Sequence, residues 1–208
     1  MLKGFLFDLD GTIWDSERTI VETIFQTVAE AGVKISENEA RKQFKNSVSP
    51  IAVLRYYGVS TELFWRNYKK NYANIQLFFS DTHEILSTLT ERERKIGFIT
   101  SLKKEFALSL LRKFDLLEYY LVLITPSECR APKPSPAPLN MAFDRLSIQN
   151  IQAIYVGDQN SDIIAANRAG CKSGLARWGV RNAINEPSDY VFQKLNDILP
   201  LSQGRADE

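Results

Sequence analysis

The chain has 208 residues, of which 44% are hydrophobic and 25% charged, with 26 basic against 25 acidic side chains. This length and composition indicate a compact globular core with a smaller inserted unit, and they exclude a disordered chain. Because the charges nearly cancel, nothing predicts nucleic-acid binding, and an anionic ligand must be held by a local group of residues.

The only two cysteines, Cys129 and Cys171, lie far apart in the sequence. Such a pair indicates reduced thiols, as in an intracellular protein. The first residues lack the extended apolar region of a signal peptide. No stretch approaches the ~18 apolar residues that a membrane span needs. We therefore expect a cytoplasmic protein with no membrane contact.

Four short apolar runs stand out along the chain, at residues 4–7, 96–99, 121–124 and 153–156. Runs of this length that are apolar on both faces are typical of central strands in a parallel sheet. Helical spacing separates the later runs, as at Phe106, Leu110 and Phe114. Alternating strands and helices predict a doubly wound, Rossmann-like α/β core, in which ligands bind beyond the carboxyl ends of the strands.

The segment after the first run shows helical patterns with no strand between them. Asp15 or Ser16 can cap a helix that buries Ile20, Ile24 and Val28 and stops at Gly32. Further helical stretches are predicted at residues 37–44, 50–57 and 61–72. We therefore expect an α/β core of residues 1–13 and 80–208 and an all-helical insertion of residues 14–79.

Two carboxylates follow the first predicted strand, Asp8 and Asp10. Side chains two residues apart on an extended chain project to the same side. Like charges placed so closely persist best with a hard cation between them, and oxygen ligands suit Mg²⁺. For Asp8 considered by itself, a capping or solvated aspartate at a strand end is a fair alternative.

The other predicted strand ends carry polar residues of complementary kinds. Thr100 and Ser101 follow the second strand and offer hydroxyl and backbone N–H groups for an anion. Lys133 follows the third between prolines, and Asp158 and Asp162 follow the fourth. Together these residues supply the components of a phosphoryl-transfer site: a nucleophile, an acid, a phosphate clamp, a cation and metal carboxylates.

The order of these motifs resembles the four-motif signature of the haloacid-dehalogenase superfamily. The motifs are Asp8-Leu9-Asp10-Gly11-Thr12, Thr100-Ser101, Lys133-Pro134, and Gly157-Asp158 with Asp162. The helical insertion resembles that superfamily's smaller α-helical cap. Within the superfamily the chain is most similar to the phosphoglycolate-phosphatase-like group, which also contains β-phosphoglucomutases, nucleotidases and pyrophosphatases.

The resemblance implies a role for each motif residue. Asp8 would attack phosphorus and form an aspartyl-phosphate. Asp10 would act as acid and then as base, and its backbone carbonyl would bind the metal. Thr100 and the amide of Ser101 would hold phosphoryl oxygens, while Lys133 would neutralise the phosphate and orient Asp8. Asp158 would bind Mg²⁺ directly, and Asp162 would be either a ligand or an anchor behind the ligands.

Two features depart from the pattern of the group. Trp14 stands where a smaller aliphatic residue is usual, at the entry to the insertion. A loop containing Lys45, Asn46 and Ser47 lies where relatives place a substrate-reading loop, but it lacks the expected glycine. We expect these four residues to influence substrate choice, and they leave the identity of the substrate open.

The resulting hypothesis is a Mg²⁺-dependent phosphatase that hydrolyses a small phosphorylated metabolite through an aspartyl-phosphate. A phosphomutase, in which a sugar takes the phosphoryl group, is an alternative that the sequence separates poorly. A phosphorylated receiver module is a second alternative, but it would have no need of an acid at Asp10. A binding protein without catalysis is a third, and the retention of all four motifs argues against it. The sequence predicts no oligomeric state.

Overall fold

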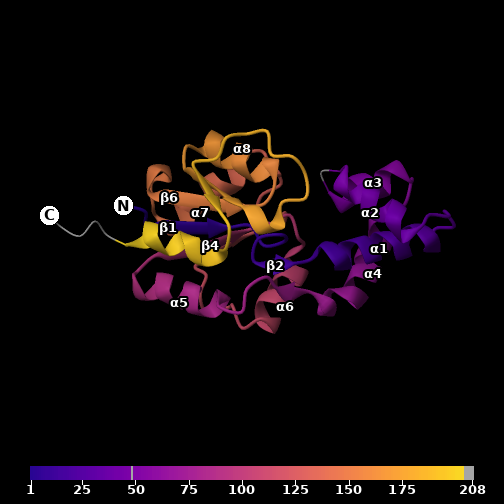
Figure 1. Ribbon diagram of the computed structural model, residues 1–208, viewed down its shortest axis with the longest axis horizontal. Helices are drawn as coiled ribbons and strands as arrows, with labels where there is room; N and C mark the ends of the chain where they lie inside the picture. Colours follow the sequence, from indigo (N-terminus) through magenta and orange to yellow (C-terminus); the bar gives the residue numbers. More distant parts are fainter. Residues whose placement is uncertain (48, 204–208) are drawn as a thin grey trace. The chain divides into compact units, whose positions relative to one another are not determined.

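The computed structural model describes residues 1–47 and 49–203 (Figure 1). The chain divides into two compact units. The first joins Met1–Trp14 to the chain from Leu77 onward, and the second is Asp15–Gln76. The chain passes between them within two short strands, β2 (Trp14–Asp15) and β3 (Gln76–Leu77), which pair with each other.

A six-stranded parallel sheet forms the centre of the first unit, in the order β5-β4-β1-β6-β7-β8. The strands are β1 (Gly4–Phe7), β4 (Lys95–Ile99), β5 (Val122–Ile124), β6 (Ala153–Gly157), β7 (Lys172–Ala176) and β8 (Tyr190–Phe192). The predicted α/β fold is confirmed, and β1 lies between β4 and β6. The last two strands were not predicted from the sequence.

Helices cover the sheet because its strands are apolar on both faces. On one face, α7 (Ala137–Leu146) and α8 (Asn160–Ala169) pack in a cluster that contains Leu6 and Tyr155 of the strands. Side chains alternate along a strand, so the neighbouring Phe5 and Phe7 point to the other face. There α5 (Thr82–Glu91) packs against β4 and against the 3₁₀ helix η4 (Leu195–Ser202). The helix α6 (Lys104–Lys113) follows β4.

The second unit is helical. Its elements are α1 (Glu17–Glu30), α2 (Glu37–Lys45), α3 (Pro50–Tyr56), α4 (Thr61–Asn71) and the short 3₁₀ helix η1 (Tyr72–Asn74). Serine side chains accept backbone N–H groups at the starts of three of these helices, at Ser36, Ser49 and Ser60. Such N-caps fix where each helix begins.

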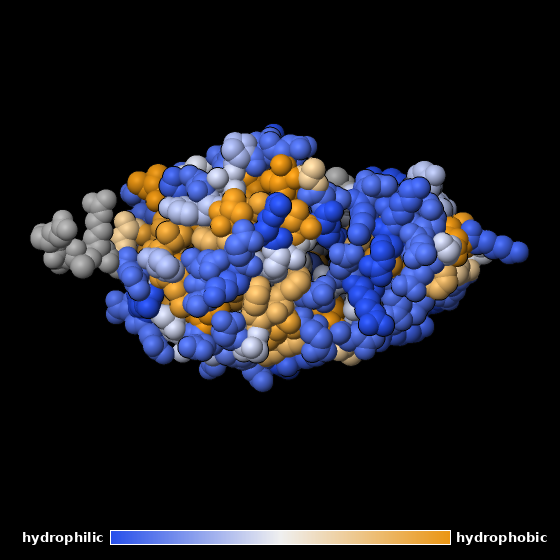
Figure 2. All heavy atoms as spheres, viewed as in Figure 1, coloured by the Kyte–Doolittle hydropathy of each residue, from blue (hydrophilic) through white to orange (hydrophobic). Residues whose placement is uncertain are grey.

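The described surface carries few large exposed apolar side chains. On the face drawn in Figure 2, hydrophilic side chains predominate over the helical unit. Tyr56, Leu121, Ile151 and Val191 are exposed but lie far apart in the sequence, and no two of them share a helix or strand. Within residues 1–47 and 49–203, no helix combines the length and apolar character that crossing a membrane requires.

Candidate active site

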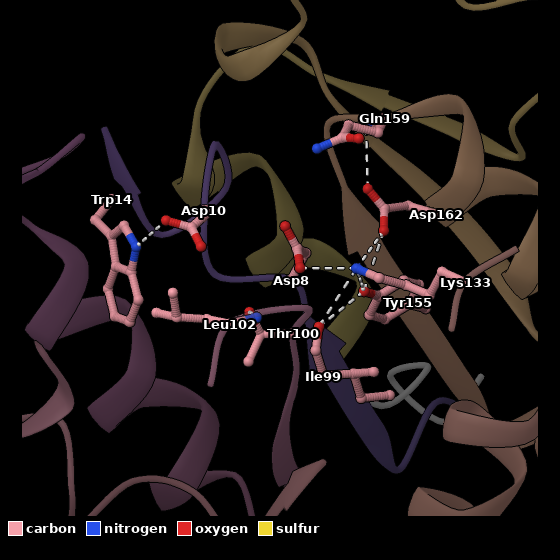
Figure 3. Close-up of polar contacts among 10 residues, drawn as sticks. All are labelled: Asp8, Asp10, Trp14, Ile99, Thr100, Leu102, Lys133, Tyr155, Gln159 and Asp162. Carbon is pink, nitrogen blue, oxygen red and sulfur yellow. Dashed lines mark hydrogen bonds and ion pairs between the residues drawn. The ribbon is translucent and has the colours of Figure 1, made fainter. Parts of the chain in front are cut away.

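The predicted site residues of the first unit gather at one edge of the sheet (Figure 3). Asp8 directly follows β1, Thr100 follows β4, and Asp158 follows β6. Because these three neighbouring strands are parallel, their carboxyl ends meet at the same edge. The connection from β5 to α7 adds Lys133, which precedes Pro134 through a cis peptide bond.

Lys133 stands at the centre of this group. Its Nζ donates to Oδ1 of Asp8 at 2.7 Å and to Oδ1 of Asp162 at 2.6 Å. The lysine side chain is 7% exposed, and those of Asp8 and Asp162 are 6% and 1% exposed. The other oxygen of Asp162 accepts the backbone N–H of Gln159 at 3.0 Å, where α8 begins. The ammonium group therefore ties the end of β1 to the first turn of α8.

Tyr155 is a member of the site that the sequence analysis missed. Its hydroxyl accepts a hydrogen bond from Nζ of Lys133 at 2.8 Å. The same hydroxyl lies 3.1 Å from the carbonyl oxygen of Ile99 and 3.2 Å from Oδ1 of Asp162, to which it can donate. The available signal was a single polar group within the apolar strand β6, where Tyr155 is the register partner of Leu6 and lies on the same face of the sheet.

Burial and charge set the protonation states in this group. Burial raises the pKa of Asp8 to about 7, against the opposing effect of the Lys133 ammonium. Burial alone would lower the pKa of Lys133, but the carboxylates of Asp162 and Asp8 outweigh it and hold that pKa well above its usual range. The lysine therefore stays charged, and the nearby carboxylates provide its compensation.

Asp158 is buried, and its carboxylate makes no hydrogen bond to the part of the chain that the structure describes. Only 1% of its surface is exposed. Burial, followed by the charges of Asp162 and Asp8, raises its pKa well above the ordinary value, while Arg181 opposes the rise. An ionised carboxylate in such a place is costly unless a cation compensates it.

The arrangement of these carboxylates fits a hard metal ion. Asp8, Asp158 and Asp162 can each offer a ligand atom, and these atoms all lie within 4.8 Å of one another. Oxygen donors of this kind suit Mg²⁺. A cation would also give the two oxygens of Asp158 the partner that the described protein atoms do not provide.

Thr100 and Ser101 are placed differently from each other. Thr100 is 5% exposed, and its hydroxyl oxygen accepts the backbone N–H of Leu102 at 3.1 Å. Ser101 is exposed. The helix α6 begins only at Lys104, so the groups expected to bind an anion lie in a bend that precedes the helix.

Asp10 and Trp14 interact directly. The indole N–H of Trp14 donates to Oδ1 of Asp10 at 2.9 Å, and Asp10 lies between Trp14 and Asp8 (Figure 3). Trp14 is completely buried within the first unit. The other three residues expected to influence substrate choice belong to the second unit: Lys45 ends α2, and Asn46 and Ser47 follow it.

The 3₁₀ helix η3 (Arg177–Gly179) contacts the turn that follows Asp8. The indole N–H of Trp178 donates to the carbonyl oxygen of Thr12 at 2.9 Å. A Cβ atom on Gly179 would lie 1.7 Å from the carbonyl oxygen of Gly11. A Cβ on Gly11, whose φ is +86°, would lie 2.4 Å from Oδ2 of Asp158. Glycine at both positions allows the two segments to approach each other and the carboxylate of Asp158.

Replacing Gly179 by alanine is therefore expected to destabilise the first unit. Backbone atoms would have to move to admit the methyl group, which costs about 1–3 kcal/mol or more. Gly32→Ala is the matched control, since Gly32 has a φ of +84° with no atom near the added Cβ and should cost about 1–2 kcal/mol. Urea unfolding measures both, and a Gly179→Ala variant as stable as the parent would contradict the close packing.

A parallel α/β sheet with buried carboxylates and a lysine beyond its strand ends is an arrangement typical of an enzyme site. The family model of the haloacid dehalogenase-like hydrolases matches residues 5–176, and the chain belongs to this family. The predicted superfamily and the prediction of a hydrolase are thereby confirmed.

Relatives and solved structures extend the likeness along nearly the whole chain. A protein of Caldanaerobacter subterraneus subsp. tengcongensis named "Putative pyrophosphatase PpaX" is 30% identical, over 98% of this chain and 96% of the relative. A phosphoglycolate phosphatase of Photorhabdus laumondii is 25% identical, over 95% and 91%. The crystal structure of a "putative phosphoglycolate phosphatase" from Lactobacillus plantarum has a TM-score of 0.83 at 25% identity, covering 97% and 99%. These names support the predicted class of enzyme, a phosphatase.

Proposed function

We propose that the chain is a Mg²⁺-dependent phosphatase that hydrolyses a small phosphorylated metabolite through an aspartyl-phosphate at Asp8. The observation that carries the proposal is the buried contact of Asp8 with Lys133 beside the carboxylate of Asp158, which has no hydrogen-bond partner among the described residues. This combination offers a nucleophile, a fixed positive charge and a metal ligand in one place. The names of two relatives, "Phosphoglycolate phosphatase" and "Putative pyrophosphatase PpaX", support a small phosphorylated substrate.

Asp8, Asp158 and the backbone carbonyl of Asp10 would hold the metal ion. When bound, Mg²⁺ would neutralise charge on the phosphoryl group and on the carboxylates around it. Both oxygens of Asp162 already accept hydrogen bonds, from Lys133 and from Gln159. We therefore assign Asp162 the role of an anchor for Lys133 behind the direct ligands.

In the first half of the reaction, a carboxylate oxygen of Asp8 forms a bond to phosphorus as the bond to the leaving oxygen breaks. Asp10 transfers its proton to that oxygen, so the product leaves as a neutral hydroxyl compound. Lys133 orients Asp8 and offsets the charge of the phosphoryl group. Thr100 and the amide of Ser101 hold its non-bridging oxygens.

In the second half, Asp10 acts as a base. It takes a proton from a water molecule while the water oxygen attacks phosphorus. The bond between phosphorus and the Asp8 oxygen breaks, which releases inorganic phosphate and restores the carboxylate. Asp10 then carries the proton that the next cycle requires, so atoms and charges balance over one turnover.

The helical unit is proposed to act as a cap that recognises the leaving group of the substrate. In this role Lys45, Asn46 and Ser47 would contact the part of the substrate beyond the phosphoryl group, and closure would exclude water from the aspartyl-phosphate. Lys45 supplies a positive charge at the end of α2, which suits an anionic metabolite. A small substrate fits an enclosed site better than a phosphoprotein or a nucleic-acid end.

Steady-state hydrolysis of a panel of phosphorylated metabolites and p-nitrophenyl phosphate tests this function. We expect Mg²⁺-dependent release of phosphate that EDTA abolishes. Replacing Lys45, Asn46 and Ser47 by alanine should change kcat/KM unequally across metabolites and much less for p-nitrophenyl phosphate. Activity after complete chelation, phosphopeptides as the best substrates, or an equal loss on every substrate would each contradict one part of the proposal. Transfer to a sugar hydroxyl instead of water would identify a phosphomutase.

The stabilisation by Mg²⁺ is expected to depend on pH. The pKa of Asp8 is raised from 3.8 to about 7, so the metal-free fold favours its protonated form and loses stability as the pH rises through this window. Metal binding needs the ionised carboxylate. The rise in Tm on adding Mg²⁺ should therefore be larger at about pH 8 than at about pH 5.5. Differential scanning fluorimetry measures it, and an equal rise at both values, or an unchanged rise in Asp158→Asn, would contradict the site.

A further inference from the structure

Trp14 holds the carboxylate of Asp10 through a bond that the mechanism above does not use. Its indole Nε1 donates to Oδ1 of Asp10 at 2.9 Å. An indole N–H is a donor only, so the carboxylate oxygen must be the acceptor. In Figure 3 the Asp10 side chain is drawn with this oxygen toward the indole ring. A hydrogen bond to a carboxylate oxygen is stronger than one between neutral groups, so it fixes the orientation of the Asp10 side chain.

The indole ring is itself fixed by its surroundings. The Trp14 side chain is fully buried, and its ring lies against that of Phe114, at the end of α6, with centroids 5.9 Å apart. Backbone hydrogen bonds also fix the turn that carries Trp14. Gly11 N–H donates to the Trp14 carbonyl at 3.0 Å, and Trp14 N–H donates to the Leu9 carbonyl at 3.2 Å. The donor therefore sits on a short closed turn that begins next to the proposed nucleophile.

We propose that Trp14 is a positioning residue for Asp10, and that its hydrogen bond gives the two carboxylate oxygens different roles. Oδ1 stays on the indole N–H, and Oδ2 carries the proton that moves to the leaving oxygen. An oxygen that already accepts an N–H is the poorer site for a proton, so the proton resides on its neighbour. This inference rests on the proposed phosphatase function, because it gives Trp14 a role only through the acid at Asp10.

Trp178, in η3, provides a matched control because its indole contacts the same turn. Its indole N–H also donates at 2.9 Å, but to the backbone carbonyl of Thr12 and not to a side chain that moves protons. Its ring also packs on an aromatic side chain, that of Phe79, with centroids 5.1 Å apart. Trp14→Phe and Trp178→Phe therefore each remove one indole hydrogen bond and much of one ring. Only the first removes a contact with Asp10.

The test compares kcat/KM for p-nitrophenyl phosphate and for an alkyl phosphomonoester that the parent hydrolyses. For each substrate, kcat/KM reports on the steps up to formation of the aspartyl-phosphate. In these steps an alkyl leaving oxygen needs a proton, whereas p-nitrophenolate does not. We expect Trp14→Phe to lower it about tenfold or more for the alkyl ester, and less than about twofold for p-nitrophenyl phosphate. Trp178→Phe should lower both by the same factor. An equal loss on both substrates in Trp14→Phe would overturn the inference.

A second measurement does not require Trp14→Phe to fold. The protein has three tryptophans, so three indole N–H signals can be assigned in a ¹⁵N-labelled sample. In Asp10→Asn the Trp14 signal should move farther than that of Trp178, and a Trp14 signal that stays in place would overturn the inference. If the parent hydrolyses no phosphomonoester, the proposed function fails. If it does, and Trp14→Phe shows no dependence on the leaving group, only the role of Trp14 fails.

Discussion

Replacing Asp8 by asparagine is expected to lower turnover by roughly four to six orders of magnitude while the fold remains intact. The amide keeps the shape of the side chain but lacks the negative charge that attacks phosphorus. Its carbonyl oxygen can still accept a hydrogen bond from Lys133, which also keeps its contact with Asp162. The raised pKa of Asp8 shows that its charge is costly in the metal-free fold, so removing it should not reduce stability.

Phosphate release and thermal unfolding measure the two parts of this prediction. Asp144→Asn is the matched control, because it makes the same chemical change at an exposed position of α7. That variant should keep the activity of the parent. Activity of Asp8→Asn within tenfold of the parent, in protein free of wild-type contamination, would exclude a covalent role for Asp8.

Replacing Lys133 by methionine is expected to reduce both stability and activity. The methionine would leave two buried carboxylates without their shared cation, and breaking a buried ion pair in this way costs about 3–5 kcal/mol. Turnover should also fall by roughly 10²–10³-fold, because a fixed positive charge facing the phosphoryl group is lost. The loss of stability should shrink at lower pH as Asp8 gains a proton.

The ion pair between Lys172 and Asp189 is the matched control for this change. Its N–O distance of 2.6 Å equals that of Lys133 and Asp162, but the two side chains are 50% and 31% exposed. Exposed pairs contribute little, so Lys172→Met should lower stability much less than Lys133→Met does. Urea unfolding at neutral pH compares the two variants. Equal losses of stability in the two variants would show that burial does not make the ion pairs of Lys133 more important for stability than an exposed pair.

The strands that the sequence predicted are those whose residues carry a sheet-like pattern by themselves. β5, β4, β1 and β6 lie side by side in this order, and every residue of these four strands except Lys95 is buried. β7 and β8 were missed for physical reasons. β7 contains Lys172, Ser173 and Gly174, and β8 is an edge strand of three residues in which Val191 is 54% exposed. Their strand character depends on pairing with β6 and with each other.

The site was predictable as far as it depends on strand ends. Parallel neighbours bring residues that follow each strand to one edge, so Asp8, Thr100 and Asp158 could be expected together before any coordinates. The roles of Tyr155 and Trp14 depend instead on contacts across the fold. Tyr155 reaches Lys133 from the middle of a buried strand, and the Trp14 indole faces Asp10 four residues earlier in a closed turn. No spacing rule in the sequence indicates either contact.

The central claim is that phosphorus becomes bonded to Asp8 during turnover. Rapid acid quenching of Asp10→Asn with Mg²⁺ and p-nitrophenyl phosphate, whose leaving group needs no proton from Asp10, followed by mass spectrometry of the peptides, tests it most directly. Asp10→Asn can no longer activate water, so the intermediate should accumulate, and the peptide containing Asp8 should gain the mass of one HPO₃ group. Asp8→Asn should show no such peptide. Phosphate release by the parent enzyme with no phosphopeptide in Asp10→Asn, or a phosphoryl group on any other residue, would contradict the account.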